Sequence, residues 1–378
     1  MSLTIDPRPT ARAAGPTADE FAERALGALA GWAESMAMHL GVRLGWYAEL
    51  AAHGPSTADE LANRTHTSAR YAREWLEQQA VTGVLSVAEP AEGAGTRDVG
   101  AAGRRFAIAP GVAEALTDER SLAYIGPLPR MLAAVGVQMP ALVEAYRTGG
   151  GVSWDELGDD ARHAQADANR PWYDRLPEVF AGVERLDRVL SRPSSRVADV
   201  GMGAGWSSIA LASAYPDLRV DGFDVDAPSV GLARANAEAA GVSDRVRFHL
   251  AGGDSIERLG PFDAAFAFEC LHDMPRPVEV LRAMRGAVRD DGPVVVMDEA
   301  VGDGFAVPGA DLDALMYAFS LFVCLPDSMS HPGSVATGTV MRPDTLREYA
   351  REAGFDGLDV LPIEGFGFWR FYELTRAA

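Results

Sequence analysis

The chain has 378 residues, 48% of them hydrophobic, and its 34 basic and 54 acidic residues give a formal net charge of −20; this composition fits one large or two smaller folded domains. With so negative a charge and no basic patch, binding to nucleic acid or to an anionic membrane surface is not expected. We find neither a signal-peptide core nor a run of about 18 apolar residues, and the two cysteines favour free thiols in a reducing cytoplasm.

The N-terminal third is predicted to be a small, mainly helical domain preceded by a disordered tail at residues 1–17. Its predicted elements are two helices within 18–52, interrupted at Gly41, further helices that begin near Pro55 and Thr67, and strands at 84–87 and 105–108. Helices followed by a two-stranded hairpin are typical of a winged helix, which we place at residues 18–120.

A winged helix can place a recognition helix in the major groove of DNA, and Ser68–Gln79 would be that helix. Its arginines are balanced by Glu74 and Glu77, however, and its apolar side looks like that of a packing helix. The residues on that side are Tyr71, Trp75 and Leu76. We therefore expect the domain to pair subunits in a homodimer and to bind no nucleic acid.

Residues 121–175 are predicted to form a helical connector with a flexible turn at Gly149–Gly151. From residue 176 to residue 378, strands and helices alternate, which predicts a doubly wound α/β domain with a seven-stranded sheet. The predicted strands are 196–200, 219–224, 246–250, 263–268, 293–298, 357–363 and 366–374. The predicted helices between them are 207–214, 229–240, 277–288 and 343–353.

A glycine turn follows the first of these strands, in the segment Asp199-Val-Gly-Met-Gly-Ala-Gly-Trp206. Its glycines let backbone N–H groups approach a ligand, and Asp224, which ends the next strand, can accept hydrogen bonds from both hydroxyls of a ribose. A dinucleotide-binding turn would carry a small residue in place of Trp206, so NAD and FAD are disfavoured. The layout predicts a site for a nucleoside cofactor without a pyrophosphate.

This turn, with an acidic residue two positions before its first glycine, resembles motif I of class I S-adenosylmethionine-dependent methyltransferases, and the resemblance spans about residues 196–374. With the front domain, the chain is similar to winged-helix-fused methyltransferases of bacteria, largely actinobacteria. The resemblance implies S-adenosylmethionine as cofactor, with Asp224 on its ribose and Val225 on its adenine. The implied cofactor-binding residues are Asp199, Gly201, Gly203, Gly205, Asp224, Val225, Gly253, Asp254, Ser255 and Glu269. Asp254 would accept from the adenine amine, or else cap the short turn that follows.

The segment Phe268–Met274 follows the strand whose C-terminal end faces the transferable methyl group in this family. It resembles the His-Asp-aromatic stretch of small-molecule O-methyltransferases, although Met274 replaces the aromatic residue. The resemblance makes His272 the candidate general base, as a neutral imidazole. Glu299, at the end of the next strand, is the second catalytic candidate: it would orient His272 or bind an acceptor hydroxyl, or else it is a surface or capping carboxylate.

Large apolar and soft side chains are concentrated between Asp303 and Arg342, where this fold commonly has a lid over the acceptor. Such a lining suits a planar or terpenoid-like small molecule, whereas plain helix packing or a dimer contact is the alternative. The candidate substrate residues are Tyr173, Met316, Tyr317, Trp369 and Arg370, the last of which could instead form a surface ion pair. No metal is predicted, because the histidines His249, His272 and His331 lie on separate elements.

These patterns predict a cytoplasmic methyltransferase that acts on an aromatic or polyketide-like secondary metabolite. Three alternatives stay open: an S-adenosylmethionine-binding enzyme of rearrangement or cyclisation, a ligand-responsive winged-helix regulator of transcription, and a nicotinamide oxidoreductase. Formation of S-adenosylhomocysteine during turnover would exclude the first, and the net charge of −20 argues against the second.

Overall fold

The computed structural model of the chain describes residues 15–88 and 103–376. They form two compact units, one ending at Ala133 and the other beginning at Ala134. Most of the predicted N-terminal tail, and most of the loop between the two strands of the front domain, lie outside the described residues.

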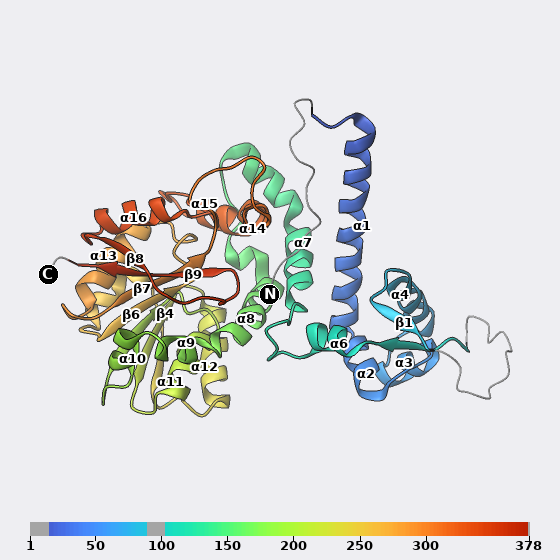
Figure 1. Ribbon diagram of the computed structural model, residues 1–378, viewed down its shortest axis with the longest axis horizontal. Coiled ribbons are helices and arrows are strands. Elements are labelled where there is room, and N and C mark those ends of the chain that lie inside the picture. Colours follow the sequence, from blue (N-terminus) through green and yellow to red (C-terminus); the bar gives the residue numbers. More distant parts are fainter. Residues whose placement is uncertain (1–14, 89–102, 377–378) are drawn as a thin grey trace. The chain divides into compact units, whose positions relative to one another are not determined.

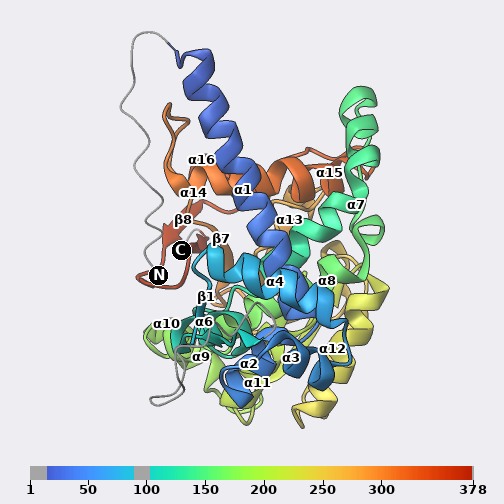
Figure 2. The same cartoon turned by 90° about the vertical axis from the view of Figure 1, so that its right-hand side faces the viewer.

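The first unit contains helices and a two-stranded antiparallel sheet, in the order of a winged helix. Its elements are α1 (Ala18–Arg43), α2 (Trp46–His53), α3 (Ala58–Thr65), α4 (Ala69–Val81), β1 (Leu85–Val87), β2 (Phe106–Ile108) and α6 (Pro110–Thr117). Helix α1 is continuous in Figures 1 and 2, so the predicted interruption at Gly41 is wrong. The break falls at Gly45, whose φ is 70°. Gly41 instead allows close packing, because a Cβ there would come within 2.4 Å of the rings of Tyr47 and Trp75.

Helix α4, the predicted recognition helix, contributes to the core of this unit. Trp75 and Leu76 are buried as predicted, whereas Tyr71 is 75% exposed and does not belong to the packing side. The arginine of the first turn, Arg70, forms an ion pair with Glu74. The helix thus packs through its apolar side and carries a locally balanced charge on its outer side.

The second unit is an α/β domain that the chain enters along α7 (Pro127–Thr148). Its helices are α8 (Trp154–Tyr173), α9 (Leu176–Ala181), α10 (Glu184–Leu190), α11 (Trp206–Ala214), α12 (Ala227–Ala239), η1 (Gly253–Arg258), α13 (Pro277–Ala287), α14 (Asp311–Phe319), η2 (Ser320–Cys324), α15 (Leu325–Met329) and α16 (Pro343–Glu352). Its strands are β3 (Arg196–Val200), β4 (Arg219–Asp224), β5 (Val246–Leu250), β6 (Ala264–Phe268), β7 (Val294–Glu299), β8 (Gly357–Val360) and β9 (Trp369–Thr375).

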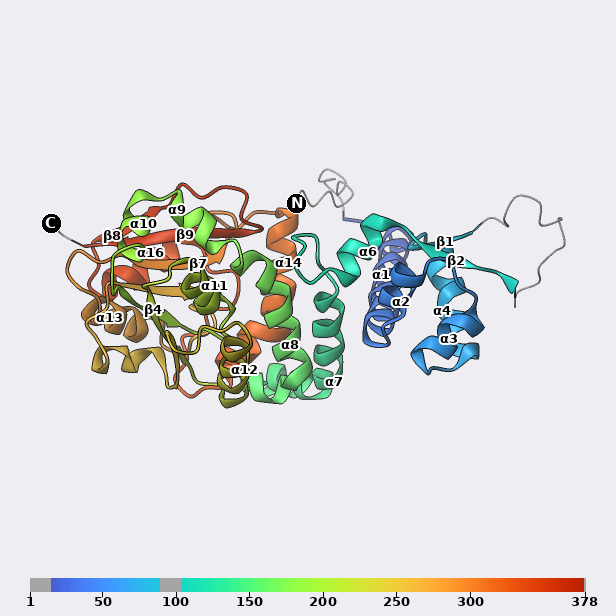
Figure 3. The ribbon, with the colours of Figure 1, turned by 90° about the horizontal axis from the view of Figure 1, so that it is seen from below.

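The seven strands form one sheet in the order β5-β4-β3-β6-β7-β9-β8, which confirms the predicted fold class. The five strands from β5 to β7 run parallel, and β9 is antiparallel to both of its neighbours. Helices cover both faces (Figures 1 and 3). Alternate residues of β6 show the two layers, since Ala265 and Ala267 pack under α13 and α16 while Phe266 stacks on Phe180 of α9.

The last two strands are shorter than predicted, because β8 ends at Val360 and β9 begins only at Trp369. The register of β7 and β9 places Trp369 opposite Glu299 and Arg370 opposite Asp298. Directly opposed residues of an antiparallel pair point to the same face. The pairing of β7 with β9 therefore brings two of the predicted substrate residues to the end of the strand that carries the catalytic candidate.

The continuous helical segment Asp311–Met329, made of α14, η2 and α15, passes a test of length and apolar composition for crossing a membrane, in the part of the chain that the structure describes. Its strongest apolar window is 39% buried inside this unit. The segment is also the predicted lid over the acceptor. An apolar lining for a small molecule is therefore a second explanation of its composition.

Candidate active site

The three positions of the turn after β3 require glycine for different structural reasons. All three have positive φ, which favours glycine. A Cβ at Gly201 would lie 2.6 Å from Sγ of Cys270, and one at Gly205 would lie 2.7 Å from the ring of Phe248. A Cβ at Gly203 would meet no atom within 4 Å. Gly203 is therefore the glycine that leaves open backbone for a ligand, whereas Gly201 and Gly205 are required by packing.

Asp199 lies under this turn and has room for a donor. It is 1% exposed, and its Oδ2 accepts hydrogen bonds of 2.6 Å from the hydroxyls of Ser207 and Ser208. Its Oδ1 is buried and has no hydrogen-bond partner among the described residues. Burial raises the pKa of Asp199 to about 6, and the serine hydrogen bonds oppose this shift. An unpartnered buried oxygen at this place fits the ammonium group of a bound cofactor.

The end of β4 has the features of a nucleoside site. Asp224 accepts the N–H groups of Gly203 and Asp226, each at 2.9 Å, and so holds the glycine turn against β4. The apolar side chain of Val225 is 71% exposed, as a residue that covers a planar ring would be in the free protein. Asp226 caps α12 and also pairs at 2.7 Å with Arg162, which leaves 11% of its side chain exposed.

The turn after β5 agrees only in part with its predicted role. Asp254 is exposed, and no side-chain capping bond occurs at the start of η1, where Gly252 is the N-cap; the capping alternative for Asp254 is therefore wrong. The hydroxyl of Ser255 donates to the carbonyl of Gly252 at 2.7 Å. A Cβ at Gly253 would lie 2.5 Å from Val200, so packing explains this glycine.

His272 is 1% exposed and lies among three carboxylates. Its Nδ1 is 3.0 Å from both oxygens of Asp298, and its Nε2 is 3.2 Å from Oδ1 of Asp273. Oε2 of Glu299 lies 3.3 Å from Nδ1. Glu299 is 2% exposed, so the surface alternative for this residue is wrong. Asp298, which the sequence analysis did not single out, is the residue that orients His272.

The protonation of this cluster follows from its burial and charges. Burial alone would lower the pKa of His272, but the charges of Asp273, Asp298 and Glu299 outweigh it and raise that pKa well above 6.5. The charged form of the imidazole is thus favoured over that of an isolated histidine, and the neutral imidazole expected from the sequence stays a prediction. Burial, together with the charge of Asp298, raises the pKa of Glu299.

The same residues bear on the prediction that no metal is bound. His272, Asp298 and Glu299 offer three possible ligand atoms within 4.8 Å of one another, as do His272, Asp273 and Cys324. The argument that the candidate ligands do not cluster is therefore wrong, because it considered histidines alone. The hydrogen bonds between His272 and Asp298 explain the first cluster without an ion. The absence of a metal stays a prediction.

Helix α8 supplies polar residues that the sequence analysis missed. Asn169 Nδ2 donates to Glu269, a residue with a φ of 52°, and Gln165 Nε2 donates to it at 3.3 Å. Burial raises the pKa of Glu269 to about 7. Tyr173, predicted to contact substrate, is buried near Glu269 and Asp199, whose charges, after burial itself, raise its pKa. Tyr173 thus lies next to two of the candidate cofactor residues, and its role toward substrate stays a prediction.

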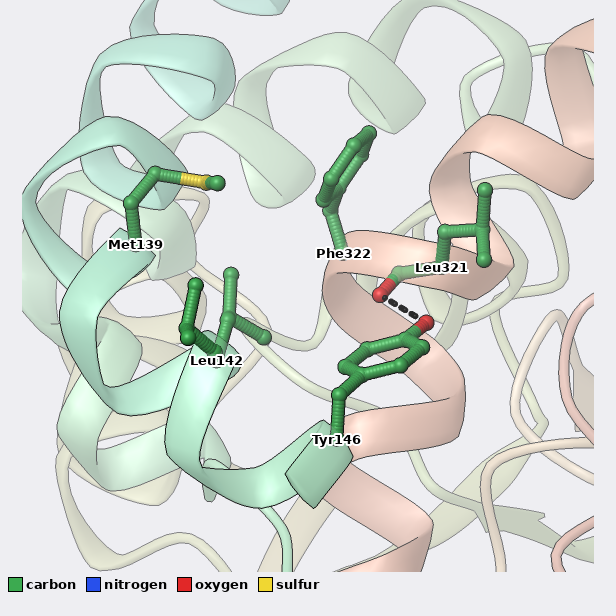
Figure 4. Close-up of a pocket in the computed structure, with 6 residues that line it drawn as sticks. Met139, Leu142, Tyr146, Leu321 and Phe322 are labelled. Carbon is green, nitrogen blue, oxygen red and sulfur yellow. Dashed lines mark hydrogen bonds between the residues drawn. The ribbon is translucent and has the colours of Figure 1, made fainter.

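The lid segment borders an apolar groove of about 320 Å³. Figure 4 shows Met139, Leu142 and Tyr146 on α7 facing Leu321 and Phe322 on η2, and the hydroxyl of Tyr146 donates to the carbonyl of Leu321 at 2.9 Å. The groove is lined by Met139, Leu142, Val143, Tyr146, Leu321 and Phe322. η2 is a π-helix, a form that is frequent at functional sites. At its end, Sγ of Cys324 lies within 4.8 Å of the ligand atoms of His272 and Asp273.

The other predicted substrate residues do not all meet at His272. Met316 is buried and Tyr317 is 40% exposed, with its hydroxyl 3.5 Å from Arg342. Arg370 pairs with the exposed Asp303 at 3.6 Å, which bears out the ion-pair alternative. Trp369 is 6% exposed and lies opposite Glu299 in the sheet. Among the predicted substrate residues other than Tyr173, Trp369 is therefore the one that the strand register ties to a catalytic candidate.

Comparison with known proteins identifies the families that both parts of the chain resemble. Residues 197–292 match the family model described as "Methyltransferase domain", and residues 33–92 match the one described as "Rv2258c-like winged HTH domain". The ubiquinone biosynthesis O-methyltransferase of Pseudomonas aeruginosa is 27% identical over 212 residues, which cover 54% of this chain and 86% of that protein.

Solved structures of similar fold cover almost the whole chain. An O-methyltransferase family protein from Burkholderia thailandensis has a TM-score of 0.68 at 18% identity, covering 97% of this chain and 99% of that one. Human N-acetylserotonin methyltransferase in complex with S-adenosylmethionine has a TM-score of 0.62 at 18% identity, covering 96% and 100%. The protein is thus a class I S-adenosylmethionine-dependent methyltransferase. More narrowly, it combines this domain with an N-terminal Rv2258c-like winged helix, and S-adenosylmethionine is its cofactor.

Proposed function

We propose that the protein methylates a hydroxyl group of a small aromatic or polyketide-like molecule, with His272 as the general base. The observation that carries this proposal is the buried imidazole of His272, held through Nδ1 by Asp298 at 3.0 Å, two residues after Cys270. Cys270 in turn donates to the carbonyl of Val200 and packs on Gly201 of the glycine turn. The loop that carries the candidate base is therefore attached through Cys270 to the candidate cofactor site.

The residues of the chain perform two tasks in this mechanism. When bound, S-adenosylmethionine supplies an electrophilic methyl group on a sulfonium. Gly203, Asp224 and Val225 would hold its nucleoside end, and Asp199 and Glu269 would hold its ammonium group. Nε2 of His272 takes the proton of the acceptor hydroxyl once Asp273, whose side chain is 34% exposed, has moved aside, and Asp298 stabilises the imidazolium that forms. Alignment of the hydroxyl oxygen with the methyl carbon at about 3–3.5 Å is the other requirement.

Apolar surroundings support a small organic acceptor. The groove beside η2 has no charged lining residue, and its volume lies at the lower end of the range of about 300–1,000 Å³ that small-molecule sites have. The names of the similar proteins, which act in ubiquinone biosynthesis and on N-acetylserotonin, point to the same class of acceptor.

A panel assay tests the reaction. Incubation with S-adenosylmethionine and a set of phenols and hydroxylated polyketides is expected to yield O-methylated product and one S-adenosylhomocysteine per product molecule. Turnover of an acceptor without S-adenosylhomocysteine would mean a rearrangement or cyclisation instead. Methylation of a nitrogen or carbon atom in every productive acceptor would contradict the proposed hydroxyl chemistry.

We further propose that the front domain pairs two copies of the chain through α1. The apolar side chains along this helix are exposed in the single chain, although such residues are seldom left in water together. They include Phe21, Leu26, Leu29, Trp32 and Leu40, which are 51–65% exposed. Sedimentation analysis is expected to give a dimer, and Leu26→Glu combined with Leu29→Glu a monomer. A monomeric wild-type protein would overturn the proposal. A cytoplasmic location also stays a prediction.

A further inference from the structure

We propose that the acceptor carries a protonated amine, and that the carboxylate of Glu299 binds this ammonium group beside the indole of Trp369. The inference rests on the methyl transfer proposed above and adds the charge of the acceptor to it.

The first argument is an unmatched carboxylate. Three carboxylates, those of Asp273, Asp298 and Glu299, lie 3.0–3.3 Å from the ring nitrogens of His272, which supplies a single positive charge. Asp298 takes the hydrogen bonding of Nδ1 with both of its oxygens. Oε2 of Glu299 lies 3.3 Å from the same nitrogen but is buried and forms no hydrogen bond within the described ranges. Such an oxygen is costly in a folded protein unless a ligand supplies the missing donor.

The second argument is the aromatic surface beside that oxygen. Trp369 lies opposite Glu299 in the β7–β9 pair, so both side chains point to the same face of the sheet. The indole ring is packed against Trp172, Phe366 and Phe368, with ring centroids 5.8, 6.1 and 4.4 Å away. Aromatic rings next to a carboxylate attract an ammonium group by both the charge and the quadrupole of the rings. The indole N–H is directed to the carboxylate of Glu269, which holds the ring at this end of the sheet.

Charge balance favours an amine over the other occupants. A neutral hydroxyl would satisfy the oxygen of Glu299 but would not stabilise its charged form, which burial and the charge of Asp298 disfavour in the free site. A carboxylate on the acceptor would be repelled by the acidic residues around His272. A metal ion would have to displace the two 3.0 Å contacts between His272 and Asp298, which already use Nδ1. Arg370, the nearest arginine along β9, points to the other face and pairs with Asp303.

Three phenols that differ in one charged group provide the test: tyramine, 4-ethylphenol and 3-(4-hydroxyphenyl)propanoate. Each is titrated by calorimetry into full-length protein saturated with S-adenosylhomocysteine. We expect tyramine to bind about tenfold more tightly than 4-ethylphenol, and the propanoate more weakly than both. The preference for tyramine should disappear in Glu299→Gln. It should persist in Glu178→Gln, a control in which the replaced side chain is 68% exposed and pairs with Arg175.

The outcomes separate this inference from the proposed function. Binding of S-adenosylhomocysteine is measured first, and its failure would remove the methyl-donor site itself. If the cofactor product binds but tyramine has no advantage in the wild-type protein, or if none of the three phenols binds, the amine proposal is overturned while methyl transfer is not. A preference that survives in Glu299→Gln would overturn it as well. The wild-type comparison decides the matter even if the variant fails to fold.

Discussion

Replacing His272 with asparagine is expected to lower kcat by about 10²- to 10⁴-fold, the usual contribution of a general base. One ring nitrogen of His272, Nδ1, is held by the carboxylate of Asp298. The other, Nε2, faces Asp273, whose side chain is partly exposed. Binding of the cofactor should be nearly unchanged, because the hydrogen bonds of the ring go to Asp298 on β7, away from the glycine turn after β3. Single-turnover assays with a productive acceptor measure the effect.

A matched control is His249→Asn. His249 also pairs with a buried aspartate, Asp221 at 2.7 Å. It lies on β5, however, which is an edge strand of the sheet and is separated from β6 by β4 and β3. Its kcat should equal that of the wild type. Normal turnover in His272→Asn would show that methyl transfer here depends on alignment alone.

The pH dependence of kcat gives an independent view of the same residue. An imidazolium cannot accept a proton, so kcat should rise with pH as His272 loses its proton. Since nearby carboxylates raise the pKa of His272 well above 6.5, this rise should be centred above pH 6.5. Asp273→Asn removes one of the charges that raise this pKa, and should move the rise to lower pH. A rise centred at or below pH 6.5 in the wild type would contradict this assignment.

The second large effect is expected for Asp224→Ala, which should weaken binding of S-adenosylmethionine at least about 100-fold, since each hydrogen bond to a charged group contributes about 1.5–3 kcal/mol. The carboxylate holds the glycine turn through the N–H of Gly203 and would also accept from the ribose hydroxyls. Isothermal titration of both variants Asp224→Ala and Asp224→Asn measures the loss, which should be smaller for asparagine because one acceptor oxygen remains.

Asp254→Ala serves as the comparison at the adenine end. Its side chain is exposed, so its loss should affect cofactor affinity less than the loss of Asp224 does. Thermal melting of each variant separates weak binding from a damaged fold. Wild-type affinity in a folded Asp224→Ala protein would place the cofactor elsewhere in the molecule.

The sequence allowed local features of the site to be predicted, because the residues that make them are close in the chain. The glycine turn, the strand that precedes it and the carboxylate at the end of β4 lie within residues 196–224, and their layout follows from one β-α-β unit. The same holds for the winged helix. Gly41 misled the prediction because a glycine's role in tight packing depends on rings from other segments, here Tyr47 and Trp75.

Features that depend on distant residues could not be predicted in this way. Asp298 and Glu299 are neighbours in the sequence, and only the position of the His272 loop decides that Asp298 takes the hydrogen bonds. Asn169 reaches Glu269 across 100 positions, and Arg162 reaches Asp226 across 64. No periodicity records such contacts. For Arg162, the signal available in the sequence was an arginine that follows several acidic residues in a helical segment.

The strand order has a consequence for how such an enzyme can diversify. The residues assigned to the methyl donor lie mainly on β3, β4 and β5, in one half of the sheet, whereas Glu299, Trp369 and the lid belong to β7, β9 and the segment between them. The chain passes from the first half to the second only once, through β6 and the His272 loop. Changes confined to the part of the chain after β6 can therefore alter the acceptor. The half of the sheet that binds the methyl donor is then inherited without change.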